Sequence, residues 1–391
     1  MANDYAPRQF LRQVQIALLR EYFTRRSELG NVEWDKLKEA EIEPIHEAWH
    51  GLPELKRKEV ESDFRRVHAM GSSDGTRAII EEGQFHQLDL TPDLDALDGH
   101  LNKALWTFMN HNNVFDVAER LHRADHLNGR FWRKRKDIPK KKPDVSAKAL
   151  EELANAISAY YWENQGRGSP CRAETYLRVG RYHYFFVYPK DYSDTFVGYD
   201  DDDKFERRPW NPAFEVVYIY DPQDGALELY VQGDKKIVRD LQELFGRAIL
   251  HEELGEETKN STPYDLSGLK RRDFSFPTDP ADRVKEVKVT ALKLSLVGKP
   301  KKRITFEDDP KEGKESIHDL IQTALDERRL PMSMVNVSSA AIKMVFENTD
   351  GGRPTKTLTF RVSYPNSCNL KDSPEELVAK KYLKEWKIER S

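Results

Sequence analysis

Two stretches of sequence decide the predicted fold of the C-terminal third, Ala291-Leu-Lys-Leu-Ser-Leu296 and Ala341-Ile-Lys-Met-Val-Phe346. Both place large apolar residues at every second position, the pattern of a β-strand with one buried face. Each is followed, after a polar turn, by a shorter match, Ile304-Thr-Phe306 in the first case and Leu358-Thr-Phe360 in the second. A helical pattern closes each unit, with apolar residues at Ile317, Leu320, Ile321 and Leu325 or at Leu377, Val378, Tyr382 and Leu383. We therefore predict a domain of two ββα units over residues 284–391.

The similarity of the two units has two explanations. A tandem duplication would produce it, and so would chance, because the matched stretches are short. If the duplication is real, a third and diverged copy could extend from Phe214 to Leu250, where we expect a strand, a turn, a second strand and a helix. Under both explanations we expect an antiparallel sheet with the helices on one face, so the fold class is α+β.

Residues 146–255 are predicted to form another α+β domain with antiparallel strands. The stretch from Ala147 to Tyr161 is rich in Ala, Leu and Glu, which favours a helix. The stretch from Tyr176 to Tyr188 is aromatic and β-branched, which favours a strand. Phe214–Tyr220 and Ala226–Val231 flank a turn that contains Pro and Gly, so they predict a hairpin.

Residues 1–129 are predicted to be an irregular helical domain. Apolar residues recur there at helical spacing, and the patterns are too short for any one helix to be stable alone. The patterns run from Arg8 to Leu29, Glu33 to Trp49, Leu55 to Val67, Leu94 to Phe108 and Val114 to Leu127. We expect these helices to bury their apolar faces against one another.

Charge and cysteine content exclude some classes of protein. The 391 residues carry 63 Lys and Arg against 67 Asp and Glu, a net charge of −4, so a nucleic-acid site must be a local patch. The only cysteines, Cys171 and Cys368, form no Cys-x-x-Cys pair, which excludes thiolate zinc ribbons and redox dithiols. No apolar run reaches the roughly 18–20 residues that span a bilayer, and no signal-peptide pattern is present. We expect a cytoplasmic protein that contacts no membrane.

Residues 130–145 are predicted to be a basic linker, because two prolines and a high charge density argue against a buried element. The segment is also our candidate nucleic-acid site, since cations release counterions from phosphates and an exposed aromatic can stack on an unpaired base. The candidate residues are Arg130, Phe131, Trp132, Arg133, Lys134, Arg135, Lys136, Lys140, Lys141 and Lys142. The alternative is a solvated linker whose two aromatic residues pack on the helical domain.

One conventional catalytic string is present, His46-Glu-Ala-Trp-His50. On a helix, His46 and His50 would share a face and could hold zinc, with Glu47 as general base. Pro44 and Gly51-Leu-Pro53 leave only a short helical platform, and no third ligand follows at a familiar distance. The other interpretation places Ile45 and Trp49 in the core and the histidines toward solvent.

These observations predict a non-enzymatic binding or adaptor protein without a cofactor. It would contact nucleic acid through the basic segment and act with protein partners in a larger complex, in nucleic-acid processing or defence. The alternative is a zinc-dependent hydrolase with His46 and His50 as ligands. A third hypothesis is an enzyme whose site is assembled from sheet residues such as Tyr182, His183, Tyr188 and Asp191.

Overall fold

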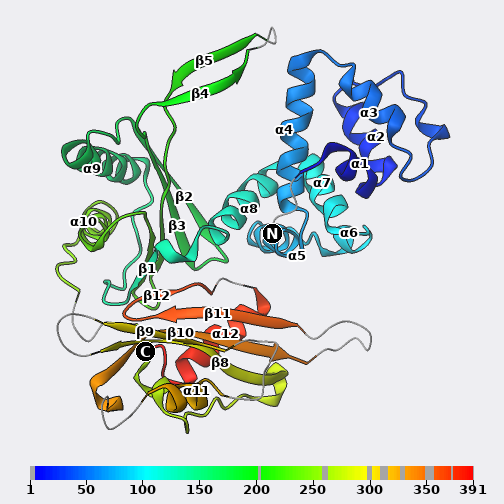
Figure 1. Ribbon diagram of the computed structural model, residues 1–391. Helices are drawn as coiled ribbons and strands as arrows, with labels where there is room; N and C mark the ends of the chain where they lie inside the picture. Colours follow the sequence, from blue (N-terminus) through cyan, green and yellow to red (C-terminus); the bar gives the residue numbers. More distant parts are fainter. Residues whose placement is uncertain are drawn as a thin grey trace. The chain divides into compact units, whose positions relative to one another are not determined.

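The computed structural model describes residues 5–200, 204–257, 263–296, 302–308, 316–325, 331–347, 356–370 and 373–390 (Figure 1). The chain forms two compact units. Unit 1 comprises Met1–Leu127, Tyr176–Arg181 and Asp191–Pro212, and unit 2 comprises Asn128–Thr175, Tyr182–Lys190 and Ala213–Ser391. Unit 1 is mainly helical and unit 2 holds two antiparallel sheets, so the predicted α+β class is confirmed. None of the described helices is long and apolar enough to cross a membrane.

Unit 1 begins with short helices around one apolar core. They are α1 (Pro7–Gln13), α2 (Ile16–Arg25), η1 (Trp34–Lys36), α3 (Glu43–His50), α4 (Glu54–Met70), α5 (Ser73–Phe85), α6 (Thr91–Asp95), α7 (His100–Asn110) and α8 (Asn112–Asp125). The ring of Phe64 on α4 contacts the rings of Phe10, Tyr22, Phe23 and Trp49. The predicted irregular helical N-terminal part is confirmed, and each short helix is stabilised by burial against the others.

A buried arginine connects α5, α8 and the end of strand β2 (Cys171–Arg178) within unit 1. The Arg178 guanidinium donates to both carboxylate oxygens of Asp125 at 2.9 Å. It also donates to Glu81 Oε2 at 3.0 Å, and only 3% of the residue is exposed. Two carboxylates therefore compensate one buried cation, as its desolvation requires.

The strands β4 (Asp194–Tyr199) and β5 (Phe205–Trp210) form a separate two-stranded antiparallel sheet in unit 1, which we call the arm (Figure 1). The register pairs Asp194 with Trp210 and Tyr199 with Phe205. Among the described residues these two strands pair only with each other.

The first sheet of unit 2 has the strand order β1-β7-β6-β3-β2. Its strands besides β2 are β1 (Trp132–Arg135), β3 (Tyr182–Pro189), β6 (Val216–Asp221) and β7 (Ala226–Tyr230). The helices α9 (Ala147–Gln165) and α10 (Lys235–Phe245), with the π-helical turn η3 (Gly246–Leu250), share one core with the sheet. The predicted hairpin is confirmed as β6 and β7, with Asp221 opposite Ala226.

The sequence predicted one strand from Tyr176 to Tyr188, and this prediction is wrong. The stretch is divided into the end of β2 and most of β3 by a turn. Val179 and Gly180 in this turn have φ angles of 45° and 67°, which reverse the chain. Only glycine adopts such angles without a steric cost, so the presence of Gly180 in the sequence could have indicated the turn.

The second sheet of unit 2 has the order β12-β11-β10-β8-β9. Its strands are β8 (Val284–Leu296), β9 (Arg303–Glu307), β10 (Val335–Phe346), β11 (Thr357–Ser363) and β12 (Ser367–Cys368). The helices α11 (Ile317–Ala324) and α12 (Pro374–Glu385) share its core, and the short turns are η4 (Ser267–Lys270), η5 (Pro280–Asp282) and η6 (Met332–Met334). The two matched stretches are direct neighbours, with Ala291 opposite Ala341. The first unit runs β8, β9 and α11, and the second runs β10, β11 and α12 with the short strand β12 inserted before the helix. The duplication itself stays a prediction.

The interpretation of residues 130–145 as a linker is wrong for its first part. Gly129–Phe131 forms the turn η2, and β1 pairs with β7 from Trp132 opposite Tyr230 to Arg135 opposite Leu227. Ion pairs with Glu228 and Glu389, far away in sequence, compensate the charge of Lys134, which the composition alone could not indicate. The predicted domain 284–391 lies within unit 2. The predicted domain 146–255 is divided, because Tyr176–Arg181 and Asp191–Pro212 belong to unit 1 and its other residues belong to unit 2.

Candidate functional site

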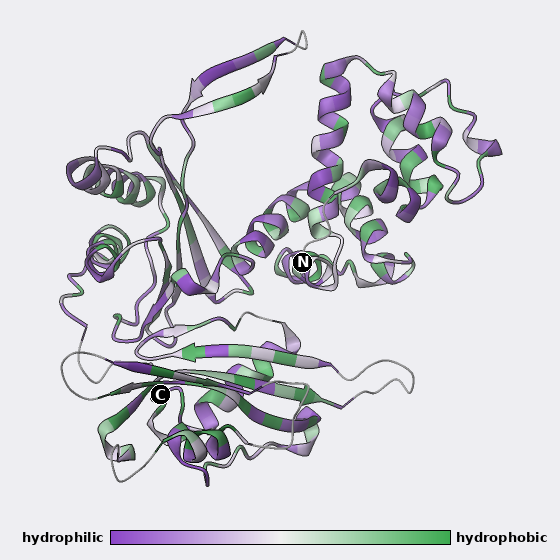
Figure 2. Ribbon diagram, viewed as in Figure 1, coloured by the Kyte–Doolittle hydropathy of each residue, from purple (hydrophilic) through white to green (hydrophobic). Residues whose placement is uncertain are grey.

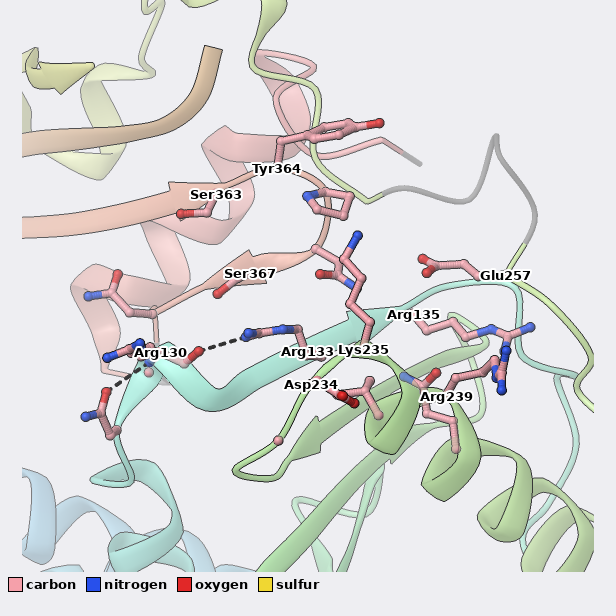
Figure 3. A pocket seen from close by; sticks show the side chains of 18 of the residues that line it. Arg130, Arg133, Arg135, Asp234, Lys235, Arg239, Glu257, Ser363, Tyr364 and Ser367 are labelled. Atoms are coloured by element: carbon pink, nitrogen blue, oxygen red, sulfur yellow. Dashed lines mark hydrogen bonds between the residues drawn. The ribbon is translucent and has the colours of Figure 1, made fainter. Parts of the chain in front are cut away.

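Unit 2 contains a pocket of about 1170 Å³ at the face of β1 (Figure 3). Three further walls enclose it: the first turns of α10, the turn that connects β11 and β12, and the segment that contains Glu256 and Glu257. Its volume exceeds the roughly 300–1,000 Å³ of ordinary small-molecule sites, and polar side chains dominate its lining.

The alternation of β1 separates the basic residues into two sets, because successive side chains of a strand point to opposite faces. Arg133 and Arg135 line the pocket. Trp132 and Lys134 line a small separate cavity together with Glu228 and Glu389. Four consecutive candidate residues therefore face two different environments.

Arg130 and Arg133 form one end of the pocket, and no carboxylate among the described residues pairs with either. The Arg133 guanidinium donates to the carbonyl oxygens of Arg130 and Trp132, both at 2.7 Å. Figure 3 shows the Arg133 side chain directed toward Arg130. Burial and the nearby charge of Arg130 lower the pKa of Arg133, so this pair repels and lacks an anion.

Arg361 of β11 belongs to the same end. Its backbone N–H donates to Asn369 Oδ1 at 2.6 Å, and Asn369 packs on the backbone at Gly129. A Cβ atom at Gly129 would lie 2.7 Å from the Asn369 Cβ, so only glycine permits this close approach. Arg361 also pairs with no described carboxylate. Three arginines without a described carboxylate partner thus line the pocket where η2 approaches β12.

The opposite end of the pocket is electrically balanced. The Arg135 guanidinium pairs with Asp137 and donates to the carbonyls of Leu254 and Gly255, both at 3.0 Å. Arg239 pairs with Asp240 at 2.9 Å. Figure 3 places Arg135, Arg239 and Glu257 together, away from Arg130. The pocket therefore has one cationic end and one compensated end.

The β11–β12 turn supplies the neutral polar wall. Tyr364 is 54% exposed, so one ring face is available for stacking. The other wall residues from this turn are Ser363, Pro365, Asn366 and Ser367. The backbone N–H of Lys134 donates to the carbonyl of Asn366 at 2.9 Å, which holds the turn against β1. Hydroxyl and amide groups here could bond sugar or base edges.

Lys134 and Lys136 lie outside the pocket. Lys134 Nζ is 3.2 Å from Glu228 and 3.3 Å from Glu389. Lys136 Nζ is 2.9 Å from Glu389 and 2.7 Å from the carbonyl of Arg390. Burial opposes the charge of Lys134, but the two glutamates outweigh it and raise its pKa. These two candidate residues are therefore structural ion-pair partners in this arrangement.

The remaining candidates of the basic segment are also placed outside the pocket. Phe131 and Trp132 pack on the ring of Tyr230, with centroids 6.1 and 5.5 Å away. Lys140 and Lys142 are exposed, and Lys141 pairs with Glu252 at 3.1 Å. The structure thus brings only Arg130, Arg133 and Arg135 of the predicted set to the pocket.

The histidine string lies on α3 as predicted, and the rings of His46 and His50 are 4.2 Å apart. Ile45 and Trp49 are buried, while His50 is exposed. Within the described ranges, no group of three His, Cys, Asp or Glu side chains could hold a metal ion. A catalytic zinc needs three protein ligands. With Glu47 as the general base, His46 and His50 supply two, and the described residues supply no third.

Sequence reasoning missed most of the pocket. The residues it did not single out include Arg361, Tyr364, Lys235, Arg239, Ser367 and Asn369. Each looks like an ordinary polar surface residue in its own stretch, so no local signal would have identified it. Comparison with protein-family models, curated proteins and solved structures finds no match for this chain.

Proposed function

We propose that this protein binds single-stranded nucleic acid and that the unit 2 pocket holds a short segment of the strand. The observation that carries the proposal is the cationic end, where Arg130, Arg133 and Arg361 have no described carboxylate partner. A phosphate would offset the burial and the repulsion from Arg130 that together lower the pKa of Arg133. Guanidinium groups bind phosphate oxygens through paired hydrogen bonds, and phosphate is the anion that nucleic acids repeat.

The shape of the site favours a single strand. A duplex carries its phosphates on the outside of a wide cylinder, so it would touch only the rim of a pocket. A single strand can bend its phosphates and bases into a concave site, where an exposed aromatic ring stacks on a base. Tyr364 supplies that ring, and Ser367 and Asn366 lie beside it on the same turn.

The wider role that we propose is that of a cytoplasmic, non-enzymatic binding subunit in a complex for nucleic-acid processing or defence. With a net charge of −4, the protein would bind nucleic acid through this local site and not through its overall charge. Cys171 and Cys368 are both free thiols, in keeping with a reducing compartment.

The experiment is a fluorescence titration of labelled single-stranded DNA and RNA, with the matching duplexes, at several salt concentrations. We expect single strands to bind more tightly than duplexes, with an affinity that falls as salt rises. In the variant with Arg130→Ala, Arg133→Ala and Arg361→Ala, the slope of log affinity against log salt should become shallower by about 0.7 per lost phosphate contact.

The matched control is the double variant Lys140→Ala and Lys142→Ala, which removes exposed cations of the same basic segment outside the pocket. It should leave affinity and slope close to those of the unchanged protein. Equal losses in both variants would point to a diffuse basic surface and overturn the assignment to the pocket. No binding of any single strand at low salt would overturn the function itself.

A further inference from the structure

The arm exposes a concentration of large hydrophobic side chains. Between 37% and 65% of each of the following residues in and beside it is exposed: Tyr192, Phe196, Val197, Tyr199, Phe205 and Trp210. Figure 2 shows hydrophobic residues interrupted by hydrophilic ones along both strands. Such a concentration of exposed large hydrophobic side chains is typical of an interaction site in a folded protein.

The pairing register assigns the side chains to two faces, because directly opposite residues of a β-pair point the same way. Val197 and Tyr199 of β4 share a face with Phe205 and Arg207 of β5, which we call the Tyr199 face. The opposite face carries Phe196, Arg208 and Glu206, together with Asp194 and Trp210. The two faces can therefore be altered separately.

Each face carries one arginine, and only one of the two arginines has a carboxylate partner among the described residues. On the opposite face, Arg208 pairs with Glu206 at 2.9 Å and stacks over the Phe196 ring at 5.2 Å. On the Tyr199 face, Arg207 stacks over Phe205 at 5.7 Å and pairs with no carboxylate among the described residues. The Tyr199 and Phe205 rings meet edge to face, with centroids 5.6 Å apart. The Tyr199 face is therefore apolar with one uncompensated cation.

A second copy of the chain does not fit this face. Stacking two Tyr199 faces would supply no carboxylate for either Arg207 from the paired residues, because none of the described residues on this face is acidic.

Nucleic acid fits the arm poorly as well. The acidic residues from 194 to 210 are Asp194, Asp200, Asp201, Asp202, Asp203 and Glu206, against the basic residues Lys204, Arg207 and Arg208. This excess of negative charge disfavours a polyanion such as nucleic acid, whereas one carboxylate can still pair locally with Arg207. An apolar occupant that carries a single carboxylate therefore fits the Tyr199 face.

From this charge complementarity we infer that the Tyr199 face docks a protein partner through an apolar groove bordered by an Asp or Glu that pairs with Arg207. A partner of this chemistry buries Val197, Tyr199 and Phe205 and compensates the cation. It would also stabilise the ribbon, since a two-stranded hairpin is only marginally stable by itself. The inference is independent of the proposed nucleic-acid site, which lies in unit 2.

The experiment selects binders to the purified full chain from a phage-displayed library of random peptides. Synthetic peptides from the selection are then titrated against the variants Arg207→Gln, Tyr199→Ser and Arg208→Gln. We expect the selected peptides to combine aromatic or aliphatic residues with Asp or Glu. Arg207→Gln should weaken their binding about tenfold, as the loss of a charge-assisted hydrogen bond predicts, and Tyr199→Ser should weaken it at least as much. Arg208→Gln is the matched control and should leave the affinity within about twofold.

Amide hydrogen exchange of residues 194–210 shows whether each variant keeps the hairpin, and Arg207→Gln is the decisive variant because it alters only an exposed cation. Three outcomes overturn the inference: no enriched peptides, enriched peptides without acidic residues, or equal weakening by Arg207→Gln and Arg208→Gln. Peptides that match this chain's own sequence would assign the face to a second copy instead. A loss of oligonucleotide binding in Arg207→Gln would assign it to nucleic acid, against the inference.

Discussion

The ammonium group of Lys134 lies 3.3 Å from a carboxylate oxygen of Glu389, so a residue of β1 is paired with one near the end of the described chain. Only 3% of Glu389 is exposed, and its carboxylate also lies 2.9 Å from Lys136 Nζ. A backbone bridge between Tyr264 and Glu389 fixes the position of the carboxylate. Two lysines predicted to bind nucleic acid are thus held by a carboxylate from a distant segment.

Replacing Glu389 should destabilise unit 2. In Glu389→Ala the two lysines lose a shared buried counterion, and we expect the free energy of unfolding to fall by about 3 kcal/mol. Urea denaturation followed by tryptophan fluorescence measures this. The control is Glu385→Ala, which removes a carboxylate that is half exposed on α12 and should cost less than about 0.5 kcal/mol. Equal effects of both variants would contradict a role for burial.

The contribution of Glu389 should depend on pH. Burial opposes its ionisation, but Lys134 and Lys136 outweigh burial and lower its pKa below the usual 4.5. A carboxyl whose pKa is lower in the folded state contributes stability above its unfolded pKa, and this is lost as pH falls through the folded value. The stability difference between the unchanged protein and Glu389→Gln should be constant above about pH 5 and should shrink below about pH 4. A pH-independent difference would contradict this assignment.

The Arg178 network should stabilise unit 1. Arg178→Met leaves Asp125 and Glu81 without their buried cation, at an expected cost of about 3 kcal/mol. Arg178→Lys keeps the charge but cannot bond both Asp125 oxygens in the same plane, so it should cost about 1 kcal/mol. Amide hydrogen exchange of α5 and α8 reports both effects. Unchanged protection in Arg178→Met would show that the network contributes nothing.

Neighbouring residues of β1 should separate binding from stability. Arg133→Ala should weaken binding of single-stranded nucleic acid about tenfold and change the free energy of unfolding by less than about 1 kcal/mol. Lys134→Ala should do the reverse, with a loss of about 3 kcal/mol and an unchanged affinity of the folded protein. The two titrations and two denaturation curves test the division of β1 into two faces. A combined alanine replacement of residues 133–136 would mix the two effects.

Much of the fold could be predicted because it depends on local patterns. The alternation in Ala291–Leu296 and Ala341–Phe346 indicated strands, and helical spacing indicated the N-terminal helices. Local patterns failed where a reversal lay inside a uniform stretch, as at Val179 and Gly180 in the turn after β2. They also failed for β1, where Lys134 is compensated by partners that sequence spacing does not show.

The site was harder to predict, for a physical reason. The clustering of Arg and Lys along the sequence predicted a binding site at residues 130–142. Strand β1 divides the side chains of its own residues between two faces, which line different cavities. Arg361 and Tyr364 come from a strand and a turn that approach β1 only in the folded sheet arrangement. Composition therefore located one wall of the pocket, and tertiary structure supplied the others.

The pairing of Lys134 with Glu389 has a consequence for the order of events during protein synthesis. More than half of the chain is translated after Lys134, so its ammonium has no Glu389 counterion until residue 389 has left the ribosome. The same delay applies to the hydrogen bond from the Lys134 amide to Asn366, which holds one wall of the pocket. The described parts of unit 1 all precede residue 213, so unit 1 can form before unit 2 is complete. The pocket lacks its β11 and β12 wall until Asn369 has been translated.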